Sequence, residues 1–180
     1  MDMNSENDMK SKIFGIGLSR TGTTTLNEVL VGLGKNVIHY PSELELFSMR
    51  FDGATDIPVT VRYKELDAKF PNSKFIYTIR NKDKWLDSIV PYLERKRGWN
   101  MAQSQVDIRT QMYGSPFPSR AQAEAAYDSH DKDVLEYFKN RKQDLLILDI
   151  IGGDSTKLLT DFLDVDPINS EFPHKNKLKK

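Results

Sequence analysis

The stretch GLSRTGTTTL, Gly17–Leu26, follows a short apolar run, KIFGI (12–16), and precedes residues with the apolar spacing of a helix. Its two glycines stand five positions apart and are followed by hydroxyl residues, which is the pattern of a phosphate-binding loop between a buried strand and a helix. Nucleotide-hydrolysing loops of this kind carry a lysine where this sequence has Thr23. The cation of the loop is Arg20, three residues earlier. The spacing therefore predicts an anion site in which an arginine supplies the charge.

The loop combines several kinds of anion-binding group. A glycine-rich turn into a helix exposes backbone N–H groups, and the helix dipole adds roughly half a positive charge. Gly22 permits close approach of the backbone, and Thr23, Thr24 and Thr25 add hydroxyl donors. The alternative, a tight turn without a ligand, accounts for the glycines alone. Because arginine is a planar fork with a permanent charge, the loop favours a terminal phosphate beside a transferred group, with no metal needed.

Strand-like and helix-like segments alternate along the rest of the chain. The predicted strands are 12–16, 36–40, 73–79 and 144–150, and the predicted helices are 23–33, 61–70, 120–142, one after Asn81 and one after 152–154. This alternation predicts an α/β fold of three αβα layers with a mainly parallel central sheet, P-loop-like in type. Such sheets bind ligands beyond the carboxyl ends of their strands. The glycine-rich loop, Arg80 and Asp149 all fall at that edge.

Other segments are predicted to be less regular. The residue before Pro58 is expected to be extended, so 54–59 is interpreted as a short extended piece. Pro91 is expected to kink or end its helix. Residues 98–118 show weak periodicity and several turn formers, which predicts an irregular excursion. The last helix is expected to bury Leu158, Leu159, Phe162 and Leu163.

Composition excludes several classes of function. A length of 180 residues predicts one domain, 12–176, between a polar lead-in, 1–11, expected to be disordered, and a basic tail, 177–180. With 26 basic and 26 acidic residues, zero net charge gives no overall attraction to nucleic acid or an anionic membrane. No apolar run reaches the length of about 18 residues that spans a bilayer, and a cytoplasmic location is expected. The absence of cysteine excludes disulfides and thiolate metal sites.

Two motifs resemble those of sulfotransferases that use 3′-phosphoadenosine 5′-phosphosulfate (PAPS). The first signature of that family is a strand, a basic residue, Ser or Thr, Gly, Thr and Thr, then a helix; this chain has RTGTT at 20–24. The second is an arginine that closes a strand and a serine eight residues later, here Arg80 and Ser88. The resemblance extends over about 13–176. It implies the sulfotransferase fold and transfer of a sulfuryl group to an acceptor hydroxyl or amine.

The resemblance also implies roles for single residues. It places the 5′ side of PAPS, or of its product 3′,5′-phosphoadenosine (PAP), on the loop residues Arg20, Thr21, Gly22, Thr23, Thr24 and Thr25. Arg80 and Ser88 are expected to hold the 3′-phosphate, with Lys175 of the basic C-terminal segment adding to it. Arg20 is further expected to neutralise charge that develops on the bridging oxygen. No metal is implied, and Thr25 stands where an aromatic residue often stacks on adenine.

The base that accepts the acceptor's proton is less clearly specified. Cytosolic members of the family carry a histidine in a Thr-His-aliphatic-Pro stretch, and the corresponding place here reads TDIP, 55–58. Asp56 is therefore the candidate base, with a turn-forming role as its alternative. His39, at the end of a predicted strand, is the second candidate. His130 lies on an apolar helix stripe and is predicted to be a hydrogen-bonded interior residue.

Two other functions remain open at this stage. A P-loop kinase acting on a nucleotide or small molecule requires a relocated lysine and a Mg²⁺ carboxylate, and the sequence presents neither. A catalytically degenerate nucleotide-binding or interaction protein is favoured by the missing histidine and the missing adenine-stacking aromatic. For the transferase, the partner is a small-molecule, glycan or peptide acceptor, and the sequence leaves its identity and the oligomeric state open.

Overall fold

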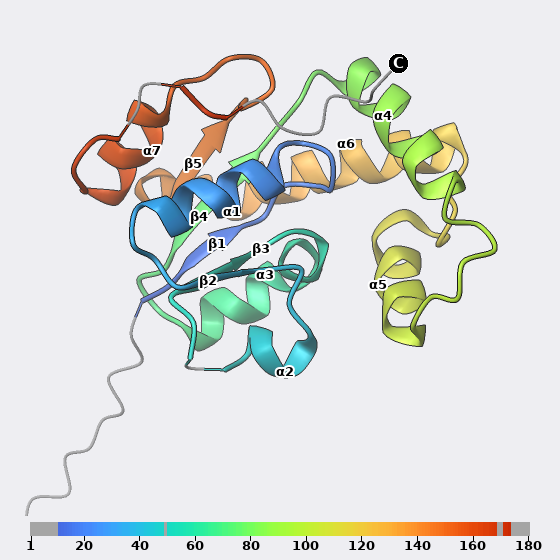
Figure 1. Cartoon of the computed structure of the whole chain (residues 1–180), viewed down its shortest axis with the longest axis horizontal. Helices are drawn as coiled ribbons and strands as arrows, with labels where there is room; N and C mark the ends of the chain where they lie inside the picture. The colour runs from blue at the N-terminus through green and yellow to red at the C-terminus, as the bar shows by residue number, and fades with distance from the viewer. Residues whose placement is uncertain (1–10, 49, 169–170, 174–180) are drawn as a thin grey trace, which may run out of the picture.

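The computed structural model describes residues 11–48, 50–168 and 171–173, and within them a single parallel sheet forms the centre of the molecule (Figure 1). Its strands are β1 (Ile13–Gly15), β2 (Val37–His39), β3 (Gly53–Thr55), β4 (Lys74–Thr78) and β5 (Leu145–Leu148). They lie in the order β2-β3-β1-β4-β5, and every pairing is parallel. From β1 the chain passes to the edge strand β2, returns to β3 beside β1, and then crosses to β4 and β5 on the other side of β1. The strand order therefore reverses at β1, and open α/β sheets bind ligands at such a switch point.

Helices cover both faces of this sheet. The helices are α1 (Thr23–Gly32), α2 (Glu43–Leu46), α3 (Ile57–Lys69), α4 (Lys82–Glu94), α5 (Gln103–Tyr113), α6 (Arg120–Tyr137) and α7 (Thr156–Leu163). Apolar residues of α1 and α7 pack on one face, and those of α2, α3 and α6 pack on the other. Figure 1 shows α4 and α5 beyond one end of the sheet. The three-layer α/β fold is confirmed.

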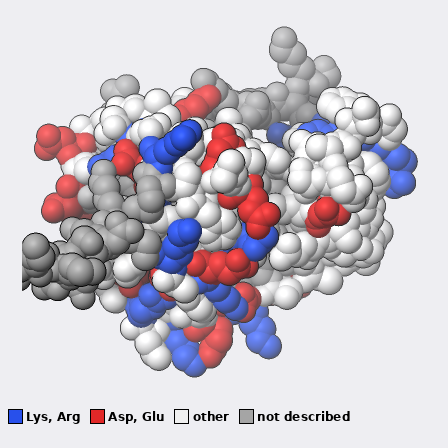
Figure 2. All heavy atoms as spheres, turned by 90° about the horizontal axis from the view of Figure 1, so that it is seen from below, with Lys and Arg blue, Asp and Glu red and all other residues white. Residues whose placement is uncertain are grey.

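The outer faces of the helices carry mixed charge. In the view of Figure 2, basic and acidic side chains lie next to one another and do not form a field of one sign. Arg62 pairs with Glu43 and with Glu65, and Lys64 pairs with Asp133. Exposed pairs of this kind contribute little to stability. Within the described residues, no helix is long and apolar enough to cross a membrane.

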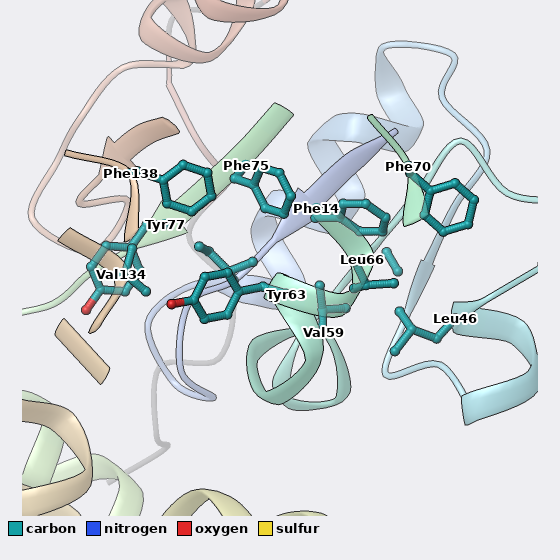
Figure 3. Packing of buried hydrophobic residues seen from close by; sticks show 12 residues of the cluster. Phe14, Leu46, Val59, Tyr63, Leu66, Phe70, Phe75, Tyr77, Val134 and Phe138 are labelled. Atoms are coloured by element: carbon teal, nitrogen blue, oxygen red, sulfur yellow. The ribbon is translucent and has the colours of Figure 1, made fainter. Parts of the chain in front are cut away.

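Aromatic rings fill the space between the sheet and the α3–α6 layer (Figure 3). Phe75 of β4 lies 5.5 Å from Phe14 of β1 and 5.0 Å from Phe138, measured between ring centroids. Tyr63 of α3 belongs to the same cluster, and its hydroxyl donates a hydrogen bond to Asp133 at 2.6 Å. Full burial of one such ring contributes roughly 1.5–3 kcal/mol. This cluster fixes β1 and β4, the two strands that end at the predicted site.

Four of the local expectations were wrong or incomplete. Residues 98–118 are not irregular throughout, because they contain α5, whose buried residues are Arg109 and Tyr113, which an apolar pattern does not reveal. Ile57, before Pro58, begins α3: Asp56 caps this helix, and a proline in the first turn removes no helical hydrogen bond. Helix α4 does not end at Pro91, because residues before and after the proline, such as Ile89 and Leu93, are buried in the protein. Leu158 is exposed, whereas Leu159 is buried.

Gly17 provides a test of how tightly the loop is fitted to the sheet. A Cβ atom here would collide with the hydroxyl of Thr78 and lie 2.5 Å from its carbonyl oxygen. We expect Gly17→Ala to lower the free energy of unfolding by about 1–3 kcal/mol, as overpacking does. The matched control is Gly32→Ala at the end of α1, where an added Cβ meets nothing within 4 Å and should stabilise by up to about 1 kcal/mol. Urea denaturation of both variants measures the difference, and equal effects would contradict it.

Candidate active site

The loop after β1 is held in a strained conformation by its own hydrogen bonds. Arg20 has φ 76° and Gly22 has φ 107°, so a non-glycine residue occupies the left-handed region. The hydroxyl of Thr21 contacts the Leu18 carbonyl oxygen at 2.6 Å and the Thr78 hydroxyl at 2.7 Å. Trp85 Nε1 of α4 donates to the Ser19 carbonyl at 2.9 Å. The hydroxyl of Thr21 is thus part of the scaffold, and contacts within the protein hold the backbone around Arg20.

The side chain of Arg20 turns toward α4. Its Nε atom donates to Ser88 Oγ at 3.1 Å, and its guanidinium lies over the ring of Tyr92 at 5.1 Å. Ser88 is buried on the inward face of α4. The structure therefore brings together Arg20 of the first motif and Ser88 of the second. The role of Tyr92 carried no signal in the sequence beyond its place on the apolar stripe.

Arg80 completes the cationic part of the site. It follows β4, and its Nη1 atom donates to the backbone carbonyl of Arg20 at 3.2 Å. Its Nε atom is buried and has no hydrogen-bond partner among the described residues. Burial and the neighbouring charge of Arg20 both lower the pKa of Arg80, and Asp149 partly offsets them. The two positive charges act on one another, and an anion that contacts both arginines would offset this repulsion and accept from the Nε donor of Arg80.

These groups line a hollow at the N-terminal end of α1. Its walls are formed by Arg20, Gly22, Thr23, Thr24, Thr25, Asp56, Arg80 and Ile151. Helix α1 begins at Thr23, and no side chain caps its N-terminus, so its first backbone N–H groups remain available to an anion. Ile151, which follows β5, was not found from the sequence because an isolated exposed isoleucine carries no functional signal. The donors present fit a phosphate or sulfate group.

Asp56 and His39 meet on the other wall of this hollow. Asp56 Oδ1 accepts hydrogen bonds from the Ser19 hydroxyl at 2.7 Å and from the Ile57 backbone N–H at 2.8 Å. Its Oδ2 atom lies 3.3 Å from His39 Nε2, which also contacts the Thr24 hydroxyl at 3.3 Å. His39 Nδ1 lies 2.9 Å from Thr55 Oγ1. Both candidate bases therefore lie within ion-pair distance of each other, and Asp56 caps α3 as well.

The remaining predicted residues are placed as follows. His130 is buried, contacts the Ile16 carbonyl oxygen at 2.8 Å and has a pKa lowered by burial, as expected for an interior histidine. Asp149 Oδ1 accepts from the Gly152 N–H at 2.7 Å and so holds its loop. Lys175 lies outside the described residues. Among those residues no cluster of three or more metal-ligating side chains occurs.

Comparison with known proteins decides the family. The model of the sulfotransferase domain matches residues 42–180, which is most of the chain. The chain belongs to the sulfotransferase domain family. The match begins after the loop of Arg20, so the assignment of that loop to the site depends on its geometry. No curated protein matches the chain at a significant level.

A solved structure supports the fold. A sulfotransferase from Alicyclobacillus acidocaldarius superposes with a TM-score of 0.59, covering 95% of this chain and 87% of that one. The two sequences share 14% identity. At that identity the similarity concerns the path of the chain, and the chemistry of the site has to be argued from its own residues.

The Nε donor of Arg80, which has no hydrogen-bond partner among the described residues, provides a test of anion binding. We expect inorganic pyrophosphate to raise the melting temperature of the native protein and to do so much less in Arg80→Met, because a buried donor and a charge are removed. The control is Arg62→Met, an arginine already paired with Glu43 and Glu65, which should keep the full effect. Thermal denaturation with and without pyrophosphate measures it. An undiminished effect in Arg80→Met would place the anion elsewhere.

Proposed function

We propose that this protein transfers a sulfuryl group from PAPS to a hydroxyl or amine of an acceptor, which is a small molecule, a glycan or a peptide. One observation carries the proposal. In a sulfotransferase domain, Arg20 and Arg80 lie together beside the uncapped N-terminus of α1, and the buried Nε of Arg80 has no partner among the described residues. Such a concentration of donors suits a ligand with several anionic groups.

Different residues of the chain would bind different parts of PAPS. When bound, PAPS supplies the sulfuryl group. The N-terminus of α1 and Thr23 to Thr25 would bind its 5′ side, and Arg80 with Ser88 would bind its 3′-phosphate. Ser88 accepts a hydrogen bond from Arg20, so the same hydroxyl also holds Arg20 in place. A fixed, permanently charged guanidinium stabilises negative charge without needing to reorganise.

Asp56, supported by His39, would accept the proton of the acceptor. Its carboxylate lines the hollow next to the arginines, which is the placement that a general base requires. The contacts with Ser19 and the Ile57 N–H fix Oδ1, while Oδ2 faces His39. This geometry supports an active enzyme over a degenerate binding protein, because it places a base at the same hollow as the anion site.

Titration calorimetry tests the nucleotide assignment. We expect PAP to bind with micromolar affinity, about −8 kcal/mol, and adenosine 5′-phosphate to bind much more weakly because it lacks the 3′-phosphate. Arg20→Ala and Arg80→Ala should each weaken PAP binding by about ten- to a hundred-fold, the effect of losing hydrogen bonds to a charged group. Binding of magnesium ATP without binding of PAP would instead favour a kinase. Unchanged PAP affinity in Arg80→Ala would contradict the role given to that residue.

Asp56→Asn tests the base. Asparagine keeps an oxygen for the hydrogen bonds from Ser19 and Ile57 but cannot take a proton at neutral pH. We expect PAP affinity within about twofold of the native value and a rate of transfer from labelled PAPS lower by about 10²–10⁴. The matched variant is His39→Gln, which should slow transfer less. The reverse ranking of the two variants would assign the proton transfer to His39.

A further inference from the structure

Helix α5 carries a buried arginine that contacts a weak hydrogen-bond acceptor. Arg109 has only 5% of its surface exposed, and its Nη1 atom donates a hydrogen bond to Met101 Sδ at 3.0 Å. Among the described residues, no carboxylate lies within ion-pair distance of it. A thioether is a weak acceptor. A buried cation is costly unless a negative group compensates it.

Two tyrosine hydroxyls lie in the same region and share this lack of partners. Tyr113, one helical turn after Arg109, is 2% exposed, and its hydroxyl has no hydrogen-bond partner among the described residues. The hydroxyl of Tyr40, after β2, is likewise buried and unpartnered. Burial raises the pKa of both phenols, and in both Arg109 lowers it while Asp56 raises it. Arg109 and Asp56 are therefore close enough to act on both hydroxyls.

Together the three groups carry more hydrogen-bond donors than acceptors. A guanidinium can only donate, and a phenol oxygen can accept a hydrogen bond but also has a proton to donate. Native proteins pair nearly all their buried polar groups, so three such groups together require an explanation. A purely structural arginine would be expected beside a carboxylate. An oxyanion is the ligand that satisfies all three at once.

Asp56 connects this donor set to the proposed reaction centre. Its carboxylate lines the hollow that contains Arg20 and Arg80, and its charge also acts on Tyr40 and Tyr113. Asp56 thus links the hollow to the donor set, and an acceptor that gives its proton to Asp56 would have to stand near both. An anionic acceptor would be repelled by Asp56 alone, and Arg109 offsets that repulsion.

We propose that Arg109, Tyr40 and Tyr113 form an acceptor subsite that binds an oxyanion on the acceptor, separate from the hydroxyl or amine that is sulfated. This inference rests on the proposed function, because it takes Asp56 as the base. It assigns the acceptor to a class, namely molecules that carry a carboxylate, phosphate or similar group besides the reacting group. Arg109 is the specificity-determining residue of this subsite.

The test compares acceptors that differ in charge and little in size. The probes are 4-hydroxyphenylacetate with its amide, N-acetyltyrosine with its amide, glycolate with its amide, and glycerol 3-phosphate with glycerol. Binding of each to the PAP-saturated protein is measured by calorimetry, for the native chain and for Arg109→Met, Arg109→Lys and Tyr113→Phe. In at least one pair we expect the anionic member to bind the native protein about ten- to a hundred-fold more tightly. The carboxylate and phosphate pairs show which oxyanion is preferred.

The variants distinguish a binding role from a structural one. In Arg109→Met the preference for the anion should disappear, in Arg109→Lys part of it should remain, and Tyr113→Phe should reduce it. The affinity for PAP should stay within about twofold in all three. Because Arg109 has no ion-pair partner among the described residues, Arg109→Met should also melt at the native temperature or above it. Tyr113→Phe retains the ring and keeps the test valid if Arg109→Met fails to fold.

The outcomes separate the inference from the proposed function. Equal binding of both members in every pair, or an anion preference that survives in Arg109→Met with native PAP affinity, overturns the subsite. If the native protein does not bind PAP, the pairs are measured on the free protein. An anion preference that Arg109→Met removes would then support the subsite while the sulfotransferase function fails. If the native protein neither binds PAP nor prefers the anionic member of any pair, both the proposed function and the subsite are overturned.

Discussion

The hydrogen bond between the hydroxyls of Thr21 and Thr78 is the contact on which the site depends. It joins the loop after β1 to the end of β4, and Gly17 must be glycine because any Cβ there would occupy the space of Thr78. Through this contact the backbone of Arg20 reaches the guanidinium of Arg80. The two arginines are thus positioned by the Thr21–Thr78 contact as well as by their own hydrogen bonds. The geometry of the anion site therefore depends on the sheet that holds the loop.

Much of the fold could be predicted from the sequence because local patterns agree with the tertiary structure. The glycine-rich loop, the strand before Arg80 and the helix after Asn81 each have turn or capping chemistry that specifies them. Helix α5 could not be predicted, because its buried side is made by Arg109 and Tyr113 and an apolar pattern is therefore weak. The start of α3 at Ile57 depends on the cap that Asp56 provides, which outweighs the extended preference before Pro58.

The sequence named residues for the site but could not give their arrangement. It paired Ser88 with Arg80 as expected ligands of the 3′-phosphate, and the structure shows in addition a contact of Ser88 with Arg20. That contact depends on the left-handed backbone of Arg20, which a non-glycine residue adopts only under tertiary constraint. Likewise, the sequence offered Asp56 and His39 as alternatives, and the structure places their side chains 3.3 Å apart. Either side chain can act as a base, so the sequence cannot choose between them. Their positions in the structure show that the two lie together.

The sheet order has a consequence for how the chain acquires its site during synthesis. The strand β1 pairs with β3 on one side and with β4 on the other, so its central position is complete only when partners far along the chain are available. Contacts of such long sequence separation form late and slowly. A ribosome adds roughly 5–20 residues per second, so the loop of Arg20 is synthesised well before Thr78. The contact between Thr21 and Thr78 cannot form until both residues have been made. The anion-binding residues therefore mature together with the sheet, and an N-terminal fragment that ends before β4 would carry the loop sequence without its geometry.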